Sequence, residues 1–486
     1  MRILFLVFLI LFSLNGYSQN YGSLPKIEQD KLLRDFELLK QALEKYHTGL
    51  YWYTPKEVYD EAFEKARAQI KGPMNVFEFH KLIAGLIVLC REDHTNIFLP
   101  QSAKSHMEEH ISFLPMRLIF LGTDLYCLAD GSEAKEDLRG KKILSINGKK
   151  PTDLVLELGN MFASDAFITK VKFSDLSGFA FSRYYFLKYG EVDAFTLELA
   201  GENTPLTLAA LPLEEINANL KKKALTNKPP SENEVLEFRT YEDKIAYLGV
   251  HSFANSSYDR NYKKFLKESF QQIEERGIKT LIIDMGQNGG GNEGNENLLY
   301  SYIGDNYQKY KAVNSKTHKL RLDNGVDKVI SYKTYGIFER AFGVERQADG
   351  SYKRKEHRGH GLMAYKKEPA HKFKGKLYVI ISPITYSGGS EFVNMVHSQD
   401  RGIFVGEETG GGYLGNTSGY SFELRLPHSA IEVDIPALQF VMNVKDMGQK
   451  PARGVLPDFE VIPSFEDILK RKNAALEFIL EKEGVK

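Results

Sequence analysis

Two short apolar runs, each followed by a glycine-rich segment, constrain the fold of this chain most strongly. Residues 279–284 and 376–382 are β-branched and apolar on both faces, a pattern typical of buried strands in a parallel sheet. The first run continues into Met-Gly-Gln-Asn-Gly-Gly-Gly at 285–291, and the second leads to Thr-Tyr-Ser-Gly-Gly-Ser-Glu at 385–391. A residue in such a position lies just outside the carboxyl end of a strand, where α/β proteins place their sites.

Helical patterns accompany both runs. Residues 391–397 place Phe392, Met395 and Val396 on one helical face, which predicts a helix directly after the second glycine-rich segment. Residues 262–273 also follow helical spacing, and Gly277 is a typical helix stop. Since residues 244–250 are strand-like again, the order strand, helix, strand predicts a crossover unit of an α/β fold.

Ser387 is the candidate nucleophile because it lies between a predicted strand and a predicted helix. The start of a helix supplies unpaired N–H groups and a partial positive charge, and the adjacent glycines let a carbonyl group come close to the backbone. The other glycine-rich loop can offer a further N–H to a developing oxyanion. Taken alone, the same residues are compatible with a simple turn or a helix cap.

Five segments, in this order, resemble the S41 peptidases: residues 247–250, 281–284 with 288–291, 385–392, 405–412 and 454–458. The resemblance covers roughly residues 240–462. It implies an α/β fold with a crotonase-like core, often joined to a PDZ-like domain, and hydrolysis of peptide or protein substrates through a serine. It implies Ser387 as nucleophile, and an oxyanion hole formed by the N–H groups of Gly388 and of Gly290 or a neighbour in the same loop. It implies no cofactor.

The general base is expected from an earlier part of the chain. Gly412 occupies the place where the processing-protease branch of the family has its lysine, so a Ser-Lys dyad is not expected. Residues 91–95, Arg-Glu-Asp-His-Thr, resemble an Asp-Gly-His-Thr signature of the tricorn-like branch, which makes His94 the candidate base. A histidine is neutral at pH 7 and can accept the serine proton. In the alternative interpretation, His94 only caps the helix that ends near Cys90.

The third catalytic member is left open by the sequence. The tricorn-like branch has a glutamate near the block that begins at Gly454, but no acid precedes that glycine here. Either Asp93, Asp446 or Asp458 orients the imidazole, or the base works without a carboxylate. Asp458 fits a turn or structural role better.

The N-terminus has the pattern of a signal peptide. It consists of one arginine, about a dozen apolar residues and a small residue before Gln19. The apolar stretch is too short to span a membrane, and the pattern predicts cleavage near Ser18 and Gln19. We therefore expect a periplasmic or secreted protein. No later stretch is long and apolar enough to predict a membrane span.

A chain of 486 residues is too long for one core. Patterning along the chain predicts a signal peptide at 1–18, a helical domain at 19–108, a β-rich domain at 109–215, a linker at 216–240 and the S41-like α/β core at 241–486. Residues 138–148 resemble the strand and turn that precede a helix in PDZ domains, and this resemblance implies that the β-rich domain is PDZ-like. The net charge is +0, so the chain lacks the excess of basic residues that is typical of a nucleic-acid-binding protein, and no nucleic-acid partner is expected. The two cysteines, Cys90 and Cys127, are expected as buried free thiols rather than a bridge.

Two other functions remain as alternatives. His106, Glu109 and His110 fit a His-x-x-Glu-His zinc pattern, but the segment shows no evident helical pattern and no downstream glutamate ligand, so no metal is expected. The second alternative is a non-catalytic binding protein for a peptide or an apolar ligand on the same fold. That alternative predicts a deep apolar pocket and a Ser387 far from any base.

Overall fold

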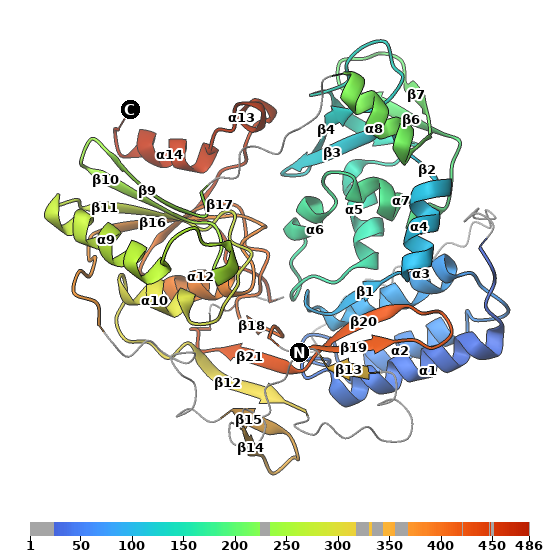
Figure 1. The fold of residues 1–486 in the computed structure, drawn as a ribbon, viewed down its shortest axis with the longest axis horizontal. Helices are drawn as coiled ribbons and strands as arrows, with labels where there is room; N and C mark the ends of the chain where they lie inside the picture. Colours follow the sequence, from blue (N-terminus) through green and yellow to red (C-terminus); the bar gives the residue numbers. More distant parts are fainter. Residues whose placement is uncertain are drawn as a thin grey trace, which may run out of the picture.

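The structure is a computed structural model that describes residues 24–223, 234–316, 330–332, 344–354, 368–419, 421–446, 448 and 452–485. It shows a mixed α/β protein (Figure 1). The predicted signal peptide lies outside the described residues. No described helix has both the length and the apolar character to cross a membrane.

A six-stranded sheet forms the centre of the C-terminal half, in the order β22-β17-β16-β11-β10-β9. Its strands are β9 (Leu236–Tyr241), β10 (Ile245–Val250), β11 (Thr280–Asp284), β16 (Lys376–Ile381), β17 (Ile403–Gly406) and β22 (Phe459–Glu460). All neighbours pair in parallel except β9, which runs antiparallel to β10. The predicted strands at 244–250, 279–284 and 376–382 are confirmed, and so is the parallel crossover between the first two.

Helices cover both faces of this sheet (Figure 1). On one face lie α9 (Tyr262–Glu275), α10 (Asn295–Ser301) and α12 (Gly388–Ser398), whose apolar side chains share one core with the sheet. On the other face, α14 (Ala474–Lys482) packs against a smaller apolar cluster. The predicted helix after Ser387 is confirmed: Phe392, Met395 and Val396 are all buried. The sheet therefore holds the start of α12 at its carboxyl edge.

The N-terminal part is helical, as predicted. It contains α1 (Gln29–Tyr46), α2 (Lys56–Arg67), α3 (Val76–Ile87), a 3-10 turn (Val88–Cys90) and α4 (Gln101–His110). The sequence showed no helical pattern around His106, but this residue lies within α4. Only Ala103 and Met107 of α4 are buried, so its apolar pattern is too sparse to be recognised in the sequence.

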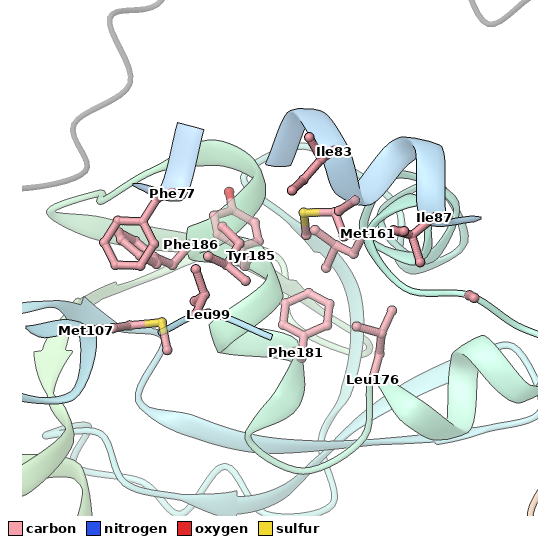
Figure 2. Packing of buried hydrophobic residues seen from close by; sticks show 14 of the residues in the cluster. Phe77, Ile83, Ile87, Leu99, Met107, Met161, Leu176, Phe181, Tyr185 and Phe186 are labelled. Carbon is pink, nitrogen blue, oxygen red and sulfur yellow. The ribbon is translucent and has the colours of Figure 1, made fainter. Parts of the chain in front are cut away.

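The next region combines a sheet with helices. β3 (Met116–Leu121), β4 (Asp124–Asp130), β5 (Lys142–Ile146), β6 (Ala194–Leu199) and β7 (Leu206–Ala209) form an antiparallel sheet in chain order. Three helices, α5 (Pro151–Leu158), α6 (Lys170–Asp175) and α7 (Ala180–Tyr189), join it to the N-terminal helices. Phe77 of α3 meets Phe186 of α7 with ring centroids 5.1 Å apart, among the apolar residues of Figure 2. Cys90 and Cys127 are buried free thiols, as expected.

The predicted linker at 216–240 is shorter than expected. Helix α8 (Leu213–Lys222) extends into it and buries Ile216 and Leu220, while β9 already begins at Leu236. The end of α8 and the start of β9 could not be recognised in this polar segment, because each element buries only a few residues. The remaining part, 224–233, lies outside the described residues.

Two smaller sheets connect distant parts of the chain. One has the order β1-β20-β19-β13, with β1 (Asn96–Phe98), β20 (Glu432–Pro436), β19 (Ser421–Arg425) and β13 (Ile330–Tyr332). The other contains β14 (Val344–Arg346), β15 (Tyr352–Arg354), β12 (Tyr310–Ser315), β21 (Leu438–Met442) and β18 (Gly415–Asn416). Because β1 pairs with β20, the N-terminal helices share one apolar core with residues 422–437. This pairing fixes the loop just before β1, which carries His94.

Candidate active site

Ser387 lies between β16 and α12, at the carboxyl edge of the central sheet. Its loop is tied to the loop after β11: Thr385 Oγ1 donates to the carbonyl of Met285 at 2.9 Å, and the N–H of Tyr386 donates to the carbonyl of Asn288 at 3.0 Å. The two glycine-rich segments recognised in the sequence are thus in direct contact.

The backbone of Ser387 is strained. Its φ is 47° and its ψ is −125°, a conformation that a residue with a side chain rarely adopts. Ser387 occupies the N-cap position of α12, but its side chain makes no capping hydrogen bond. The simple cap interpretation therefore has no support, and a strained residue at a helix start is typical of a functional position.

The glycines around Ser387 separate into those with free and those with bonded N–H groups. The N–H of Gly290 donates to Asn288 Oδ1 at 2.8 Å, so the predicted donor is already engaged. Among the described residues, the N–H groups of Gly291 and Gly388 have no hydrogen-bond acceptor. A Cβ atom built on Gly388 would lie 3.8 Å from the nitrogen of Gly291, which places these two groups side by side. The second candidate donor of the oxyanion hole is therefore the N–H of Gly291, the neighbour of Gly290.

His94 lies on the loop between the 3-10 turn and β1, near enough to Glu391 of α12 to interact with its charge. The helix cap is provided by Arg91 in the left-handed conformation, so His94 is not the capping residue. Burial lowers the pKa of His94 to about 4, and the negative charge of Glu391 acts in the opposite direction. Its Nδ1 atom has no hydrogen-bond partner within the described part of the chain.

A bridge through β18 joins the helix of Ser387 to the loop of His94. Asn416 Nδ2 donates to Glu391 Oε1 at 3.0 Å, and the next residue, Thr417, donates through Oγ1 to Glu92 Oε2 at 3.0 Å. The backbone N–H of Glu391 in turn donates to the carbonyl of Ser387 at 2.9 Å. The nucleophile loop and the histidine loop, almost 300 residues apart in sequence, therefore belong to one hydrogen-bonded unit.

Glu391 is held by a buried polar network. Its Oε2 accepts hydrogen bonds from Lys309 Nζ at 2.9 Å and Tyr310 Oη at 2.7 Å, and Lys309 also pairs with Glu296. Burial acts to raise the pKa of Glu391, but the Lys309 charge and the three donors hold it below its usual value. Glu391 is therefore a fixed negative charge near the imidazole.

The three acids considered from the sequence have different positions. The backbone N–H of Asp93 donates to Asp165 Oδ1 at 2.9 Å, and burial raises the pKa of the Asp93 carboxyl to about 6. Asp446 is exposed and accepts from the N–H of Gly448 at 2.9 Å. Asp458 Oδ2 accepts from the N–H of Phe404 at 2.7 Å and links two strands, which is the structural role expected of it. None of these three side chains is hydrogen-bonded to His94 in the described residues.

Two residues of the site were not assigned a role from the sequence. Glu391 is an acid on the buried side of an otherwise apolar helix pattern, and this mismatch is the signal that could have identified it. Asp165 lies in a weakly patterned segment within the predicted domain at 109–215, and nothing local distinguishes it. Among the described residues, no group of three or more His, Cys, Asp and Glu side chains could hold a metal ion.

Comparisons with known proteins were made for both sequence and structure. The model of peptidase family S41 matches residues 244–461, in close agreement with the stretch recognised from its motifs. No curated protein sequence shows a significant match to the chain.

Several solved structures share the fold. Mature CPAF is 14% identical, with a TM-score of 0.54 over 93% of this chain and 95% of that one. Mature CPAF complexed with lactacystin is also 14% identical, with a TM-score of 0.55 over 93% and 97% of the two chains. A serine-to-alanine mutant of CPAF has a TM-score of 0.58 at 14% identity, over 93% and 96%. The chain therefore carries a domain of peptidase family S41 at residues 244–461, which is the domain of a serine-type hydrolase.

Proposed function

We propose that this protein is an exported peptidase that hydrolyses peptide bonds through an acyl-enzyme on Ser387, with His94 as general base. The observation that carries the proposal is the strained Ser387 at the start of α12, next to the unbonded N–H groups of Gly388 and Gly291. This is the arrangement that an acyl transfer requires: a nucleophile and two donors for the oxyanion.

In the first half of the reaction, Ser387 Oγ attacks the carbonyl carbon of the scissile peptide bond, and its proton passes to the His94 imidazole. The carbonyl oxygen becomes an oxyanion that accepts hydrogen bonds from the N–H groups of Gly388 and Gly291. When the intermediate collapses, the C–N bond breaks, and the imidazolium returns its proton to the leaving amine. An ester on Ser387 remains.

In the second half, a water molecule gives its proton to His94 and attacks the ester carbon. Collapse of this intermediate breaks the bond to Ser387 Oγ, which regains the proton, and releases the new carboxyl end. Glu391 supports both halves because its fixed negative charge opposes the effect of burial on His94 and stabilises the imidazolium. It does this without a direct hydrogen bond.

Covalent labelling with a fluorophosphonate, followed by intact-mass analysis, tests this proposal. We expect one label per chain in the wild type, none in Ser387→Ala, and labelling at least about 100-fold slower in His94→Gln, since a base contributes about 100-fold to 10,000-fold. Ser390→Ala is the matched control, because Ser390 lies one turn away and donates through Oγ to the Ser387 carbonyl at 2.8 Å. This control is expected to label like the wild type.

Two results would contradict the proposal. Labelling that persists in Ser387→Ala would assign the nucleophile elsewhere. A folded wild type without any label would favour the non-catalytic binding protein, an alternative that the unpartnered Nδ1 of His94 also supports.

Export is part of the proposal and is supported by the N-terminal sequence pattern alone. The mature N-terminus can be read by mass spectrometry of the protein recovered from the periplasm or the medium of a bacterial host. We expect it near Gln19, and a chain that keeps Met1 and stays inside the cell would contradict export.

Two structural features support the finer description of the fold. A parallel sheet with helices on both faces is compatible with a crotonase-like core. β5, the following turn and α5 match the strand, turn and helix expected of the PDZ-like segment.

A further inference from the structure

Asp165 lies between two loops: one carries His94, and the other, around Gly412, is hydrogen-bonded to the loop of Ser387. Its side chain is almost fully buried, with 1% exposed. Oδ1 accepts a hydrogen bond from the N–H of Asp93 at 2.9 Å, and Oδ2 accepts one from the N–H of Gly412 at 3.0 Å. One carboxylate therefore binds the backbone of both loops, one oxygen for each.

The residues after Asp165 make a second pair of contacts of the same kind. The N–H of Ala166 donates to the carbonyl of Arg91 at 2.8 Å, and the N–H of Phe167 donates to the carbonyl of Ala452 at 3.0 Å. We call residues 165–167 the bridging segment. It connects the histidine loop on one side with the C-terminal core on the other.

Both loops lie next to reacting groups. Asp93 directly precedes His94. Gly412 follows Gly411, whose N–H donates to the carbonyl of Thr385 at 3.1 Å, and a Cβ atom built on Gly411 would lie 3.3 Å from the Ser387 nitrogen. A change in the bond to either N–H would therefore alter the position of the base relative to the nucleophile.

We propose that Asp165 is a positioning residue that holds the His94 loop against the Gly412 loop, and through it against the Ser387 loop, and that full activity requires its ionised form. The inference rests on the proposed serine mechanism and adds a residue to it. An ionised carboxylate accepts on both oxygens, whereas a protonated carboxyl carries a hydrogen on one of them. Protonation thus weakens one of the two bonds, and the site loosens.

The surroundings of Asp165 bring this ionisation into the neutral range. Burial and the nearby Asp93 charge raise the pKa of Asp165, the two N–H donors act against them, and the resulting pKa is about 7. Glu92, Tyr53 and Tyr386 also face this carboxyl, since each interacts electrostatically with it. Below pH 7 the group is protonated and one bond is weakened. Above pH 7 it is ionised and both bonds form.

The pH dependence of labelling distinguishes Asp165 from the base. His94 alone would give a labelling rate that rises near pH 4, where its imidazole loses a proton. If Asp165 must be ionised, the fluorophosphonate labelling rate rises with a midpoint near pH 7 instead. We expect this midpoint in the wild type.

Asp165→Asn is the decisive variant. Its amide keeps the shape of the side chain but can accept only one of the two N–H groups, and loss of a hydrogen bond to a charged group corresponds to about 10-fold to 100-fold in rate. We expect labelling slowed by about that factor at pH 8, without the midpoint near pH 7. Asp165→Glu keeps an ionisable carboxylate and is expected to recover the midpoint in part.

Asp175→Asn is the matched control. Asp175 interacts electrostatically with Asp93, and its pKa is likewise raised to about 7, although this residue is exposed at the surface. Within the described residues it has no hydrogen bond to either loop. The control is expected to keep the wild-type rate and midpoint. If instead the midpoint disappears in Asp175→Asn and persists in Asp165→Asn, the inference is overturned.

Amide hydrogen exchange of residues 91–95 and 409–412 separates this inference from the serine mechanism. We expect faster exchange in both loops of Asp165→Asn, with thermal unfolding close to that of the wild type. An unlabelled wild type would contradict the mechanism, while this exchange result would still support the bridging contact. Wild-type labelling rates and unchanged exchange in Asp165→Asn would overturn the inference alone. If Asp165→Asn does not fold, the pH profile of labelling decides. A midpoint near pH 4 in the wild type would overturn the inference, and a midpoint near pH 7 in both the wild type and Asp175→Asn would support it.

Discussion

Replacement of Lys309 by methionine is expected to lower the free energy of unfolding by about 3–5 kcal/mol. The side chain of Lys309 is fully buried and pairs with two buried carboxylates, Glu296 and Glu391. Without the ammonium group, both acids remain in a site that cannot hydrate them. Removing one partner of a buried ion pair is costly for this reason, even where the pair itself adds little net stability.

Denaturant unfolding at pH 7 measures this effect. Lys311→Met is the matched control, because Lys311 is the exposed lysine two residues along the same segment. It is expected to change stability by less than about 0.5 kcal/mol. The deficit of Lys309→Met is expected to shrink at acidic pH, where Glu391 takes up a proton and loses its charge. A deficit that is small at pH 7, or equal at pH 4 and pH 7, would contradict the role of Lys309 as the counter-ion of Glu296 and Glu391.

The triple variant Lys309→Met, Glu296→Gln, Glu391→Gln provides a second test. It removes both charges together with their partner, so most of the lost stability is expected to return. Since Glu391 also supports His94 electrostatically, the labelling rate is expected to remain low in this variant. Recovery of both stability and labelling would show that Glu391 has a structural role only.

Gly290→Ala is expected to slow fluorophosphonate labelling at least about 100-fold while the fold stays intact. A Cβ atom at this position would lie 2.7 Å from the Ser387 Cβ and 3.0 Å from the Gly388 nitrogen, both closer than such contacts allow. The backbone φ of Gly290 is also +101°, a value that alanine adopts only with strain. Either Ser387 or the donor of the oxyanion hole must therefore move.

Gly289→Ala is the control for this variant. A Cβ atom on Gly289 would meet nothing within 4 Å, although it is the adjacent residue of the same loop. Labelling rates and thermal unfolding of the two variants should be compared directly. Equal labelling in both variants would mean that the loop does not act on Ser387. Unfolding of Gly290→Ala alone would mean that its contact is needed for the fold.

The strands and helices of the core could be predicted because their signals are local. β10, β11 and β16 are short apolar runs, and α9 and α12 bury residues at helical spacing, so each pattern is visible within about ten residues. The candidate nucleophile was chosen from the same patterns, because Ser387 lies between a buried strand and a helix. α4 and the ends of the linker could not be predicted, because elements that bury only two residues leave no clear periodicity.

The details of the site depended on interactions that no local pattern contains. Asn288 Oδ1 accepts the N–H of Gly290, and this single hydrogen bond moves the candidate donor to Gly291. Asp165 was not identified because its carboxylate oxygens accept hydrogen bonds from backbone N–H groups, which every residue except proline has. When a carboxylate binds backbone N–H groups, the segment that it binds needs no particular side chain, so the sequence gives no sign of the contact.

The sequence by itself determined the strands of the core, the position of Ser387 between a strand and a helix, and the family resemblance, which made His94 rather than a lysine the candidate base. Only the tertiary structure decided which loops meet. The pairing of β1 with β20 brings residue 96 next to residue 434, and Asp165 connects residues 93 and 412. The physical reason is that periodicity records which face of an element is buried, whereas contacts between loops depend on hydrogen bonds between residues hundreds of positions apart.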